Sequence, residues 1–405
     1  MKCGLLGKEL CHSYSPQIHS FFGDYPYTLF EKNPDEVADF LRTGNFTGIN
    51  VTIPYKKTVL PYCTELTATA QKMGAVNTIL RKDDGSLIGH NTDYFGFLSM
   101  LQKVGIPIAH KKALVLGSGG ASATAQQVLL ELNAKVVVIS RSGENNYHNL
   151  HLHTDAALIV NCTPVGMYPD CGVTPIDLSL FPRLEAVLDM IYNPARTKLL
   201  LDAEKRNIPY ENGLWMLVAQ AKESAEWFLG KKLPDTIIAS VYSAMNKMMQ
   251  NIVLIGMPGC GKSTIGKLLS TKLGRTFVDA DEALVNFAGR TIPEIFETSG
   301  ENEFRKLETQ VLRQLCKQSG SIIATGGGCV TRKENYDLLH QNSMIIWIQR
   351  DLDLLPTAGR PISQKTSAEA LFRERKPLYD SFSDYTVINQ KDPEHTVHAI
   401  LELLK

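Results

Sequence analysis

Residues 256–263 form a glycine-rich segment with the spacing of a phosphate-binding loop. They read Gly-Met-Pro-Gly-Cys-Gly-Lys-Ser and satisfy the pattern GxxxxGK[ST] at each constrained position. The apolar residues 252–255 predict a strand before the loop, and residues 264–273 predict a helix after it, as the motif requires. Glycines let backbone N–H groups point at phosphate oxygens, and the helix N-terminus adds partial positive charge. Lys262 can reach the outer phosphates and the Ser263 hydroxyl can bind Mg²⁺, so the segment predicts a site for ATP and magnesium.

A second glycine-rich turn of a different type occupies residues 117–120. It follows a predicted strand at 113–116 and precedes a predicted helix at 121–132. Gly117 and Gly119 match the first two glycines of the dinucleotide pattern GxGxxG/A, and the third position holds the small residue Ser122. The turn therefore indicates a dinucleotide-binding fold.

The residues after the next predicted strand, 135–139, bear on the choice of dinucleotide. They read Ser140-Arg141-Ser142 and contain no carboxylate to meet a free ribose hydroxyl. A guanidinium suits a 2′-phosphate by charge and by its two-pronged geometry. The segment favours NADP over NAD, and the alternative is an exposed surface arginine without a ligand.

Composition points to an ordinary globular protein. The 405 residues suggest two or three domains, at ~150 residues each. Lys+Arg and Asp+Glu are both 42, which gives no reason to expect a nucleic acid or membrane partner. No apolar run reaches the ~18 residues of a membrane span, and the N-terminus turns polar too soon for a signal peptide. The eight cysteines form no CxxC pair, so we expect reduced thiols and a cytoplasmic protein.

Short β-branched runs alternate with helix-like stretches along the whole chain. This alternation predicts parallel α/β sheets. The remaining predicted strands are residues 49–53, 158–161, 186–188, 321–324 and 344–348. Residues 223–250 predict a helix with one break at Leu233-Pro234, and we place the boundary between the two halves at 246–250.

Seven further motifs surround the dinucleotide turn. They are residues 12–16 (HSYSP), 50–56 (NVTIPYK), 74–78 (GAVNT), 89–93 (GHNTD), 161–167 (NCTPVGM), 189–194 (DMIYNP) and 213–220 (GLWMLVAQ). In order and spacing the first half resembles shikimate dehydrogenase from end to end. The resemblance implies reversible reduction of the ketone of 3-dehydroshikimate with NADPH. Ser13-x-Ser15 is the version of its motif that prefers shikimate to quinate.

The resemblance also implies roles for individual residues. Lys56 matches the lysine that handles the proton of the reacting hydroxyl, and Asp93 matches its carboxylate partner; the alternative for Lys56 alone is a solvated lysine. The matched substrate contacts are Ser13, Ser15, Thr52, Asn77, Asp93, Tyr192 and Gln220. Met190 and Gly213 match positions lining the nicotinamide. The remaining cofactor contacts are Gly117, Ser118, Gly119, Gly120, Ala121, Ser140, Arg141 and Ser142.

Beyond the phosphate loop, residues 277–281 read Phe-Val-Asp-Ala-Asp and carry two carboxylates. If the strand continues through them, Asp279 and Asp281 lie on one face. Further motifs are residues 300–305 (GENEFR), 324–328 (ATGGG), 359–361 (GRP) and 373–379 (RERKPLY). Residues 250–405 resemble shikimate kinase, which implies transfer of phosphate from ATP to shikimate.

In this half the resemblance assigns a catalytic role to Lys262 and makes Asp281 the group that orients the attacking hydroxyl. Asp279 matches a residue of the outer shell of the Mg²⁺ that Ser263 binds, and Arg360 is a lid arginine that reaches the phosphates. Arg305, Arg375 and Gly327 match substrate contacts, and the nucleotide contacts are Gly259, Cys260, Gly261, Lys262, Ser263 and Thr264. The alternatives are solvated helix arginines, a plain turn at residues 326–328 and an ordinary helix cap at Asp279. Residues 350–355 offer no obvious second arginine just before the lid.

The sequence therefore predicts an α/β protein with three domains. Residues 1–100, joined by helices from 216–245, form a substrate domain; residues 101–215 form a Rossmann NADP-binding domain; residues 250–405 form a P-loop kinase domain with a parallel sheet flanked by helices. We interpret the chain as a bifunctional enzyme of aromatic amino acid biosynthesis that acts on small molecules. Three rivals are an inactive binding module in one half, other substrates such as quinate, and a P-loop switch or nucleic-acid ATPase. The oligomeric state stays open.

Overall fold

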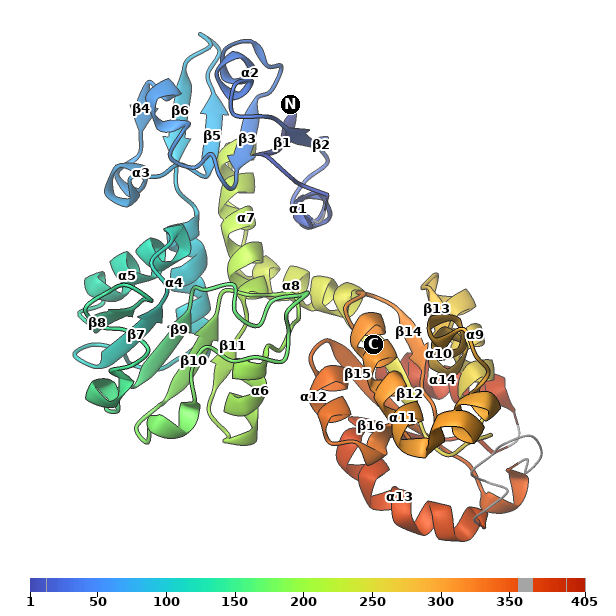
Figure 1. Ribbon diagram of the computed structural model, residues 1–405. Helices are drawn as coiled ribbons and strands as arrows, with labels where there is room; N and C mark the ends of the chain where they lie inside the picture. The colour runs from blue at the N-terminus through green and yellow to red at the C-terminus, as the bar shows by residue number, and fades with distance from the viewer. Residues whose placement is uncertain (12, 356–366, 391, 405) are drawn as a thin grey trace. The chain divides into compact units, whose positions relative to one another are not determined.

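The structure, a computed structural model, describes residues 1–11, 13–355, 367–390 and 392–404. The chain forms two compact units (Figure 1). The N-terminal unit comprises Met1–Val165, Thr174–Tyr192 and Asp202–Met245. The P-loop unit comprises Asn246–Lys405 together with the short segments Gly166–Val173 and Asn193–Leu201. The predicted lid residue Arg360 lies outside the described residues.

The first sheet of the N-terminal unit has six strands in the order β2-β1-β3-β5-β6-β4. Its strands are β1 (Cys3–Gly7), β2 (Tyr27–Glu31), β3 (Gly48–Val51), β4 (Glu65–Leu66), β5 (Thr78–Arg81) and β6 (Leu87–His90), and the helices beside them are α1 (Ser15–His19), α2 (Val37–Thr43), the 3₁₀ turn η1 (Leu60–Tyr62) and α3 (Ala68–Met73). β5 runs antiparallel to both β3 and β6, so the prediction of a parallel sheet is wrong here. Residues 82–86 join β5 to β6 through Gly85 at φ +86°, and such a short connection permits only an antiparallel pair.

The second sheet of this unit has five strands, all parallel, in the order β11-β10-β9-β7-β8. The strands are β7 (Lys112–Leu116), β8 (Lys135–Ile139), β9 (Leu158–Asn161), β10 (Ala186–Asp189) and β11 (Tyr210–Glu211), and the helical elements of this stretch of chain are α4 (Asp93–Val104), α5 (Gly120–Glu131), η2 (Leu150–His153), η3 (Leu178–Leu180), α6 (Lys198–Lys205), α7 (Gly213–Leu229) and α8 (Thr236–Met249). The predicted strands agree with β7 to β10. Their continuous apolar sequences fit strands that are covered on both faces.

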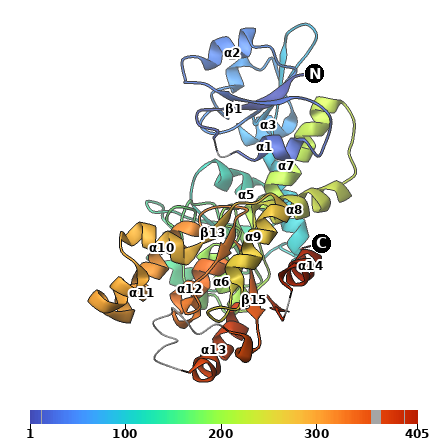
Figure 2. The same ribbon diagram turned by 90° about the vertical axis from the view of Figure 1, so that its right-hand side faces the viewer.

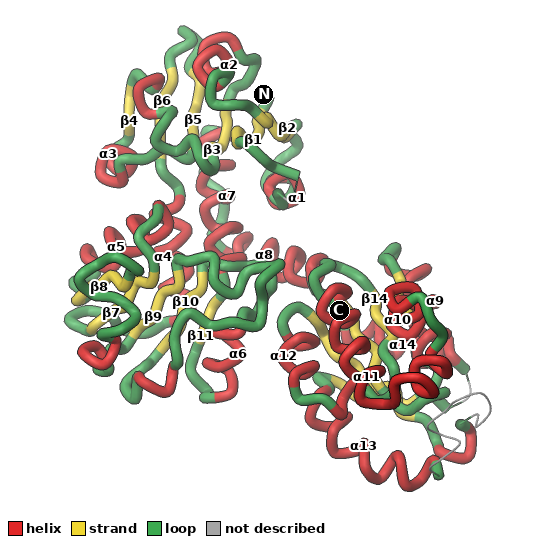
Figure 3. Tube along the Cα trace, in the orientation of Figure 1, coloured by secondary structure: helices red, strands yellow, loops and turns green. Residues whose placement is uncertain are grey.

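One helix pair joins the two sheets of the N-terminal unit. α4 packs along α7, and α7 also contacts α1 and β5 of the first sheet (Figure 3). α7 ends at Leu229, where Gly230 has φ +63°, and α8 begins at Thr236. The break predicted at Leu233-Pro234 is therefore confirmed.

The P-loop unit contains a third sheet of five parallel strands in the order β13-β14-β12-β15-β16. The strands are β12 (Asn251–Ile255), β13 (Phe277–Asp279), β14 (Ile322–Ala324), β15 (Ser343–Gln349) and β16 (Tyr385–Ile388), and the helical elements are α9 (Lys262–Leu273), α10 (Ala280–Ala288), α11 (Ile292–Leu315), η4 (Cys329–Thr331), α12 (Glu334–His340), η5 (Leu352–Leu354), α13 (Ala368–Phe382) and α14 (Pro393–Leu403). α9 packs against α14, and α10 packs against α11 (Figure 2). The strands predicted at 252–255, 321–324 and 344–348 agree with β12, β14 and β15.

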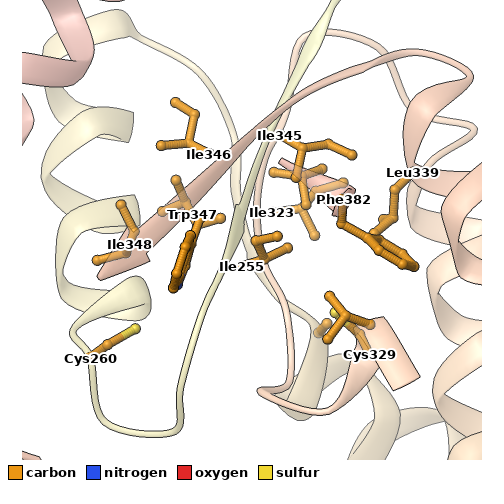
Figure 4. Packing of buried hydrophobic residues seen from close by; sticks show 14 of the residues in the cluster. Ile255, Cys260, Ile323, Cys329, Leu339, Ile345, Ile346, Trp347, Ile348 and Phe382 are labelled. Carbon is orange, nitrogen blue, oxygen red and sulfur yellow. The ribbon is translucent and has the colours of Figure 1, made fainter. Parts of the chain in front are cut away.

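The core of the P-loop unit lies around β12 and β15. Ile255 and the run from Ile345 to Ile348 are buried, and Trp347 packs between the sheet and its covering elements (Figure 4). Burying one such side chain contributes about 1.5–3 kcal/mol, so these strands form a rigid base. The loops that follow their carboxyl ends are held at one edge of the sheet, which is where ligands of α/β folds bind.

Candidate active sites

The phosphate-binding loop connects β12 directly to α9. Gly256 and Gly261 have φ of +142° and +103°, which side chains rarely adopt, so the glycines of the motif are needed for this turn. Lys262 is buried, and its Nζ donates to the carbonyl oxygens of Gly256 at 2.9 Å and Met257 at 3.0 Å. The ammonium is thus held over the loop by the loop's own backbone, beside the positive end of α9.

The carboxylates of Asp279 and Asp281 do not share one strand face, so that expectation is wrong. β13 ends at Asp279 and α10 begins at Ala280, because Asp279 is the N-cap of the helix. Its Oδ1 accepts from the backbone nitrogens of Asp281 at 3.0 Å and Glu282 at 3.5 Å. Its Oδ2 accepts from the Ser263 hydroxyl at 2.6 Å. Asp279 therefore caps a helix and also lies at the predicted metal site.

A cavity of about 740 Å³ brings most of the predicted residues of this half together. Its lining includes Gly259, Gly261, Lys262, Ser263, Thr264, Asp279, Asp281, Arg305, Gly327 and Arg375. Cys260 is fully buried and is not among the lining residues. The cavity thus joins a phosphate-binding loop to carboxylates and guanidinium groups.

The two predicted substrate arginines are buried, unlike the solvated helix arginines of the alternative interpretation. Arg305 is 7% exposed and donates to Glu308 at 2.9 Å and to Glu301 at 3.2 Å. Arg375 is 4% exposed and donates to the Gly327 carbonyl at 3.1 Å. A Cβ built at Gly328 would lie 2.1 Å from Arg305 Nη2, so a side chain at this position would have to displace the guanidinium.

Glu308 is a site residue that the sequence motifs did not include. It is 2% exposed, lines the cavity, and has a carboxylate oxygen, Oε1, without a hydrogen-bond partner among the described residues. Burial raises the pKa of its carboxyl group, whereas the Arg305 guanidinium lowers it and the Asp281 carboxylate raises it. The signal available in the sequence was the spacing of Arg305 and Glu308, which places both on one helix face.

In the N-terminal unit, Lys56 and Asp93 form an ion pair. Lys56 Nζ lies 2.5 Å from Asp93 Oδ2, and the two side chains are 32% and 15% exposed. The neighbouring Lys57 is exposed. Lys56 is therefore not the freely solvated lysine of the alternative interpretation.

Ser13, Ser15 and Tyr192 come together through Tyr14. The Ser13 hydroxyl donates to Ser15 Oγ at 3.1 Å, and the Tyr14 and Tyr192 rings meet edge to face with centroids 6.3 Å apart. Burial raises the pKa of the Tyr192 hydroxyl, and Tyr14 raises it further. Thr52 follows directly after β3. Its backbone N–H donates to the carbonyl of Leu6, in the paired strand β1, at 2.9 Å.

A buried hydrogen-bond network connects Asn77 and Gln220. Asn77 accepts from the backbone nitrogen of Thr92 at 2.7 Å and donates to its hydroxyl at 3.0 Å. The same hydroxyl donates to Gln220 Oε1 at 3.4 Å and lies 3.2 Å from Ser224 Oγ. Thr92 directly precedes Asp93, so the network also fixes the chain that carries this carboxylate. Thr92 and Ser224 belong to no predicted site, and only the tertiary structure reveals them.

The dinucleotide turn has the geometry expected of it. Gly117 has φ +100°, and its N–H donates to the Ile139 carbonyl at 2.8 Å, which places the turn beside the end of β8. The fully buried Ser122 donates to the Gly117 carbonyl at 2.7 Å. A Cβ built at Gly119 or Gly120 would meet open space. The turn thus leaves room for a ligand at the N-terminus of α5.

The other predicted cofactor residues surround this turn. Arg141 and Ser142 are exposed after β8, and Ser140 is half-buried. Burial raises the pKa of the nearby Tyr147 hydroxyl, and the Arg141 charge offsets part of that rise. Ala121, which follows Ser118 to Gly120 along the chain, is exposed in the first turn of α5. Gly213 begins α7 in contact with Met190, because a Cβ at Gly213 would lie 2.1 Å from the Met190 carbonyl oxygen.

Comparisons with known proteins find relatives of both halves of the chain. Residues 5–79 match the family model described as shikimate dehydrogenase substrate binding domain, and residues 258–405 match that described as shikimate kinase. Shikimate dehydrogenase (NADP(+)) from Clostridium botulinum strain 657 is 37% identical over 239 residues, which cover 54% of this chain and 92% of the relative. The chain belongs to the shikimate dehydrogenase family. Its C-terminal part is a shikimate kinase domain, so both enzymes are present on one polypeptide.

Solved structures resemble the dehydrogenase part. A chorismate mutase/shikimate 5-dehydrogenase fusion protein from Clostridium acetobutylicum has a TM-score of 0.57 at 34% identity, covering 60% of this chain and 97% of that one. Shikimate dehydrogenase 1 from Peptoclostridium difficile has a TM-score of 0.55 at 33% identity, covering 60% and 98%. Quinate dehydrogenase from Corynebacterium glutamicum, at 23% identity, shares the fold.

Two further observations concern the described residues of both enzymes. None of their helices is at once long and apolar enough to cross a membrane. No three of their His, Cys, Asp or Glu side chains gather into a group that could hold a metal ion. A metal at Ser263 and Asp279 would therefore depend on other oxygen donors, such as those of a bound nucleotide.

Proposed function

We propose that this chain reduces 3-dehydroshikimate to shikimate with NADPH and then phosphorylates shikimate with ATP to give shikimate 3-phosphate. The observation that carries the proposal is that one chain contains the Lys56–Asp93 ion pair and a P-loop cavity lined by two buried arginines. The product of the first reaction is the substrate of the second. The pathway is therefore that of aromatic amino acid biosynthesis.

In the dehydrogenase, Lys56 donates the proton that the developing alkoxide needs, and Asp93 holds the ammonium in place. The substrate lies among short hydroxyls and amides, which suit a small polyol acid: Ser13, Ser15, Thr52, Asn77, Tyr192 and Gln220. NADPH supplies the hydride when it is bound. The turn at residues 117–120 and the N-terminus of α5 hold its pyrophosphate, and Arg141 meets its 2′-phosphate.

Relatives support the choice of ligands. The Clostridium botulinum relative is named for NADP(+), and the Thermus thermophilus enzyme, 30% identical with a TM-score of 0.54, was solved with NADP(H) and shikimate. That structure covers 60% of this chain and 99% of its own. The exposed guanidinium of Arg141 fits a 2′-phosphate better than a free hydroxyl.

In the kinase, the backbone of the P-loop and Lys262 hold the phosphates of ATP, and Asp281 orients the shikimate hydroxyl and accepts its proton. Arg305 and Arg375 bind the shikimate carboxylate, for which guanidinium groups are well suited. Ser263 and Asp279 would hold Mg²⁺: the Ser263 hydroxyl donates to Asp279 Oδ2 at 2.6 Å, so both oxygens lie at one place, and hydroxyl and carboxylate oxygens suit magnesium. The lid arginine Arg360 completes this proposal from outside the described residues.

The domain assignment is part of the proposal. We assign residues 1–100 and 216–245 to substrate binding, residues 101–215 to NADP binding and residues 250–405 to the kinase. Three separate sheets support this division. The P-loop unit also takes in Gly166–Val173, from which the Tyr168 hydroxyl donates to the Cys316 carbonyl at 2.6 Å. A kinase fragment that starts at residue 247 would lose this contact and is expected to be less stable than the whole chain.

One coupled assay tests the proposal. The purified chain receives 3-dehydroshikimate, NADPH and Mg-ATP, while NADPH loss and ADP formation are followed together. We expect NADPH oxidation first, ADP formation after it, and shikimate 3-phosphate by mass spectrometry. NADPH oxidation without ADP formation would remove the kinase half of the proposal. Equal rates with the quinate-series ketone, 3-dehydroquinate, would remove the assignment to shikimate.

A further inference from the structure

Arg350 is a cavity residue that lies outside every motif of the kinase. It follows directly after β15. β15 pairs with β12, the strand that leads into the P-loop, and in this pair Trp347 of β15 lies beside Ile255 of β12. The Ile348 carbonyl oxygen would lie 2.4 Å from a Cβ at Gly256, so the end of β15 touches the first residue of the loop. Arg350 lines the same 740 Å³ cavity as the loop.

The charge of Arg350 is uncompensated within the described parts of the chain. Lys262 is bonded to backbone carbonyls, Arg305 is paired with two glutamates, and Arg375 is bonded to Gly327. For Arg350, by contrast, the described residues provide neither a hydrogen-bond acceptor nor an acidic partner, and its Nε atom is buried. A partly buried cation without a counter-ion is costly unless a ligand brings the opposite charge.

The order of the strands in the sheet indicates which ligand would bring the opposite charge to Arg350. β13 and β14, which lead into Asp279, Asp281 and Gly327, lie on one side of β12, and β15 lies on the other. Asp281 and Gly327, which are proposed to contact the phosphate acceptor, thus follow strands that lie across β12 from Arg350. A guanidinium in this place matches phosphate oxygens, which it can bind with two parallel hydrogen bonds.

We infer that Arg350 binds phosphate oxygens of the nucleotide held by the P-loop. The inference rests on the proposed kinase function. It assigns to the kinase a phosphate-binding arginine at the end of β15, in addition to Lys262 of the loop. Its role is to hold the polyphosphate from the side opposite the acceptor, which orients the terminal phosphoryl group toward Asp281.

The experiment compares the full-length wild type with Arg350→Ala, Arg350→Gln and Arg350→Lys. Arg313→Ala is the matched control, since Arg313 is exposed in the last turn of α11 and is not among the cavity residues. Calorimetry measures Kd for ADP with MgCl₂, and steady-state kinetics measure KM for ATP and for shikimate. A charge-assisted hydrogen bond corresponds to about a ten- to hundredfold change in affinity. We expect Kd for ADP and KM for ATP to rise by that factor in the alanine and glutamine variants, with lysine in between.

The remaining readouts separate this role from a structural one. KM for shikimate and the rate of the dehydrogenase on the same chain are expected to stay within twofold of wild type. An unchanged Kd for ADP in Arg350→Gln, or a rise in KM for shikimate alone, overturns the inference. If the wild type binds ADP but does not phosphorylate shikimate, the kinase function fails while the ADP affinities still decide the role of Arg350. If the alanine variant does not fold, the glutamine and lysine variants give the answer.

Discussion

Lys56 Nζ and Asp93 Oδ2 lie 2.5 Å apart, although 37 positions separate the two residues in the sequence. Lys56 lies in the turn after β3, and Asp93 is the first residue of α4. Thr92 fixes the position of Asp93, because its backbone and hydroxyl are both bonded to the buried Asn77. The ion pair thus depends on a polar network within the fold and not on the two side chains alone.

Replacing Lys56 with alanine is expected to lower NADPH-dependent reduction of 3-dehydroshikimate by ~10²–10⁴-fold, the usual contribution of a general acid or base. Kinase turnover on added shikimate should not change, which makes the second enzyme an internal control. Lys57→Ala is the matched control, since Lys57 is exposed beside it. A loss below about tenfold in Lys56→Ala would show that another group carries the proton.

Replacing Arg141 with aspartate is expected to reverse part of the cofactor preference. A carboxylate repels the 2′-phosphate of NADPH and can accept a hydrogen bond from the free ribose hydroxyl of NADH. The ratio of kcat/KM for the two cofactors measures the effect. Lys135→Asp serves as the control, because Lys135 is exposed at the opposite end of the same strand. If the ratio stays the same in both variants, Arg141 does not contact the phosphate.

Asp281→Asn is expected to stop phosphoryl transfer while Kd for ADP stays close to that of wild type. The substitution keeps the size of the side chain and removes the charge that orients the hydroxyl and accepts its proton. Glu282→Gln, at the next and exposed position of α10, should have little effect. Near-normal phosphorylation of shikimate by Asp281→Asn would contradict the assignment.

Gly328→Ala is expected to raise KM for shikimate or to abolish kinase activity. The added Cβ would lie 2.1 to 2.5 Å from the Arg305 guanidinium and must displace it. The dehydrogenase rate, measured on the same preparation, should be unchanged. A variant with normal KM for shikimate would show that Arg305 can move without consequence for the substrate.

Glu131 predicts a pH dependence of stability in the dehydrogenase. Hydrogen bonds from Lys72, Tyr94 and Gln127 lower the pKa of its carboxyl group to about 2. Because the pKa falls on folding, the stabilisation is fully present above the ordinary value of 4.5 and is lost as the pH falls from there toward 2. The partly exposed Lys72–Glu131 ion pair stabilises by no more than ~1 kcal/mol.

The measurement is the urea concentration that halves dehydrogenase activity, for wild type and Glu131→Gln. We expect wild type to need a higher urea concentration than Glu131→Gln, by the same margin at pH 8 and at pH 6. At pH 4 this difference in urea concentration should be smaller. Glu144→Gln is the control at an exposed glutamate. A margin that grows toward low pH would have the wrong sign for a lowered pKa.

The sequence predicted those parts of the fold whose pattern is local. The central strands of the two parallel sheets, such as β7, β9, β10, β12 and β14, are buried on both faces, so their uninterrupted apolar runs predicted them. The edge strands β11 and β16 were not predicted, because β11 is two residues long and β16 is mostly exposed. The pair β5 and β6 was missed because its strands are short, although the Asp-Gly turn before Ser86 is typical of a hairpin. Asp281 was placed in a continuing strand, but β13 ends at Asp279 and Asp281 lies in the first turn of α10, because alternation alone does not show where a helix cap ends a strand.

The residues of the candidate sites also divide into those that a local sequence pattern predicts and those that it does not. Residues in motifs could be named in advance, since each motif fixes its own spacing. Glu308 and Arg350 could not, because a charged residue in a helix or after a strand usually points into solvent. Their significance comes from neighbours that are distant in the sequence: Asp281 for Glu308, and the P-loop for Arg350.

The two oxygens of Asp279 have separate partners, with Oδ1 on the amides that open α10 and Oδ2 on the Ser263 hydroxyl. A cation that binds Oδ2 would therefore withdraw negative charge from a carboxylate that also accepts hydrogen bonds from two backbone N–H groups. The amide resonances of Asp281 and Glu282 in an NMR spectrum become reporters of metal occupancy, at a distance from any nucleotide signal. Titration with magnesium should shift these two resonances together, before shikimate is added.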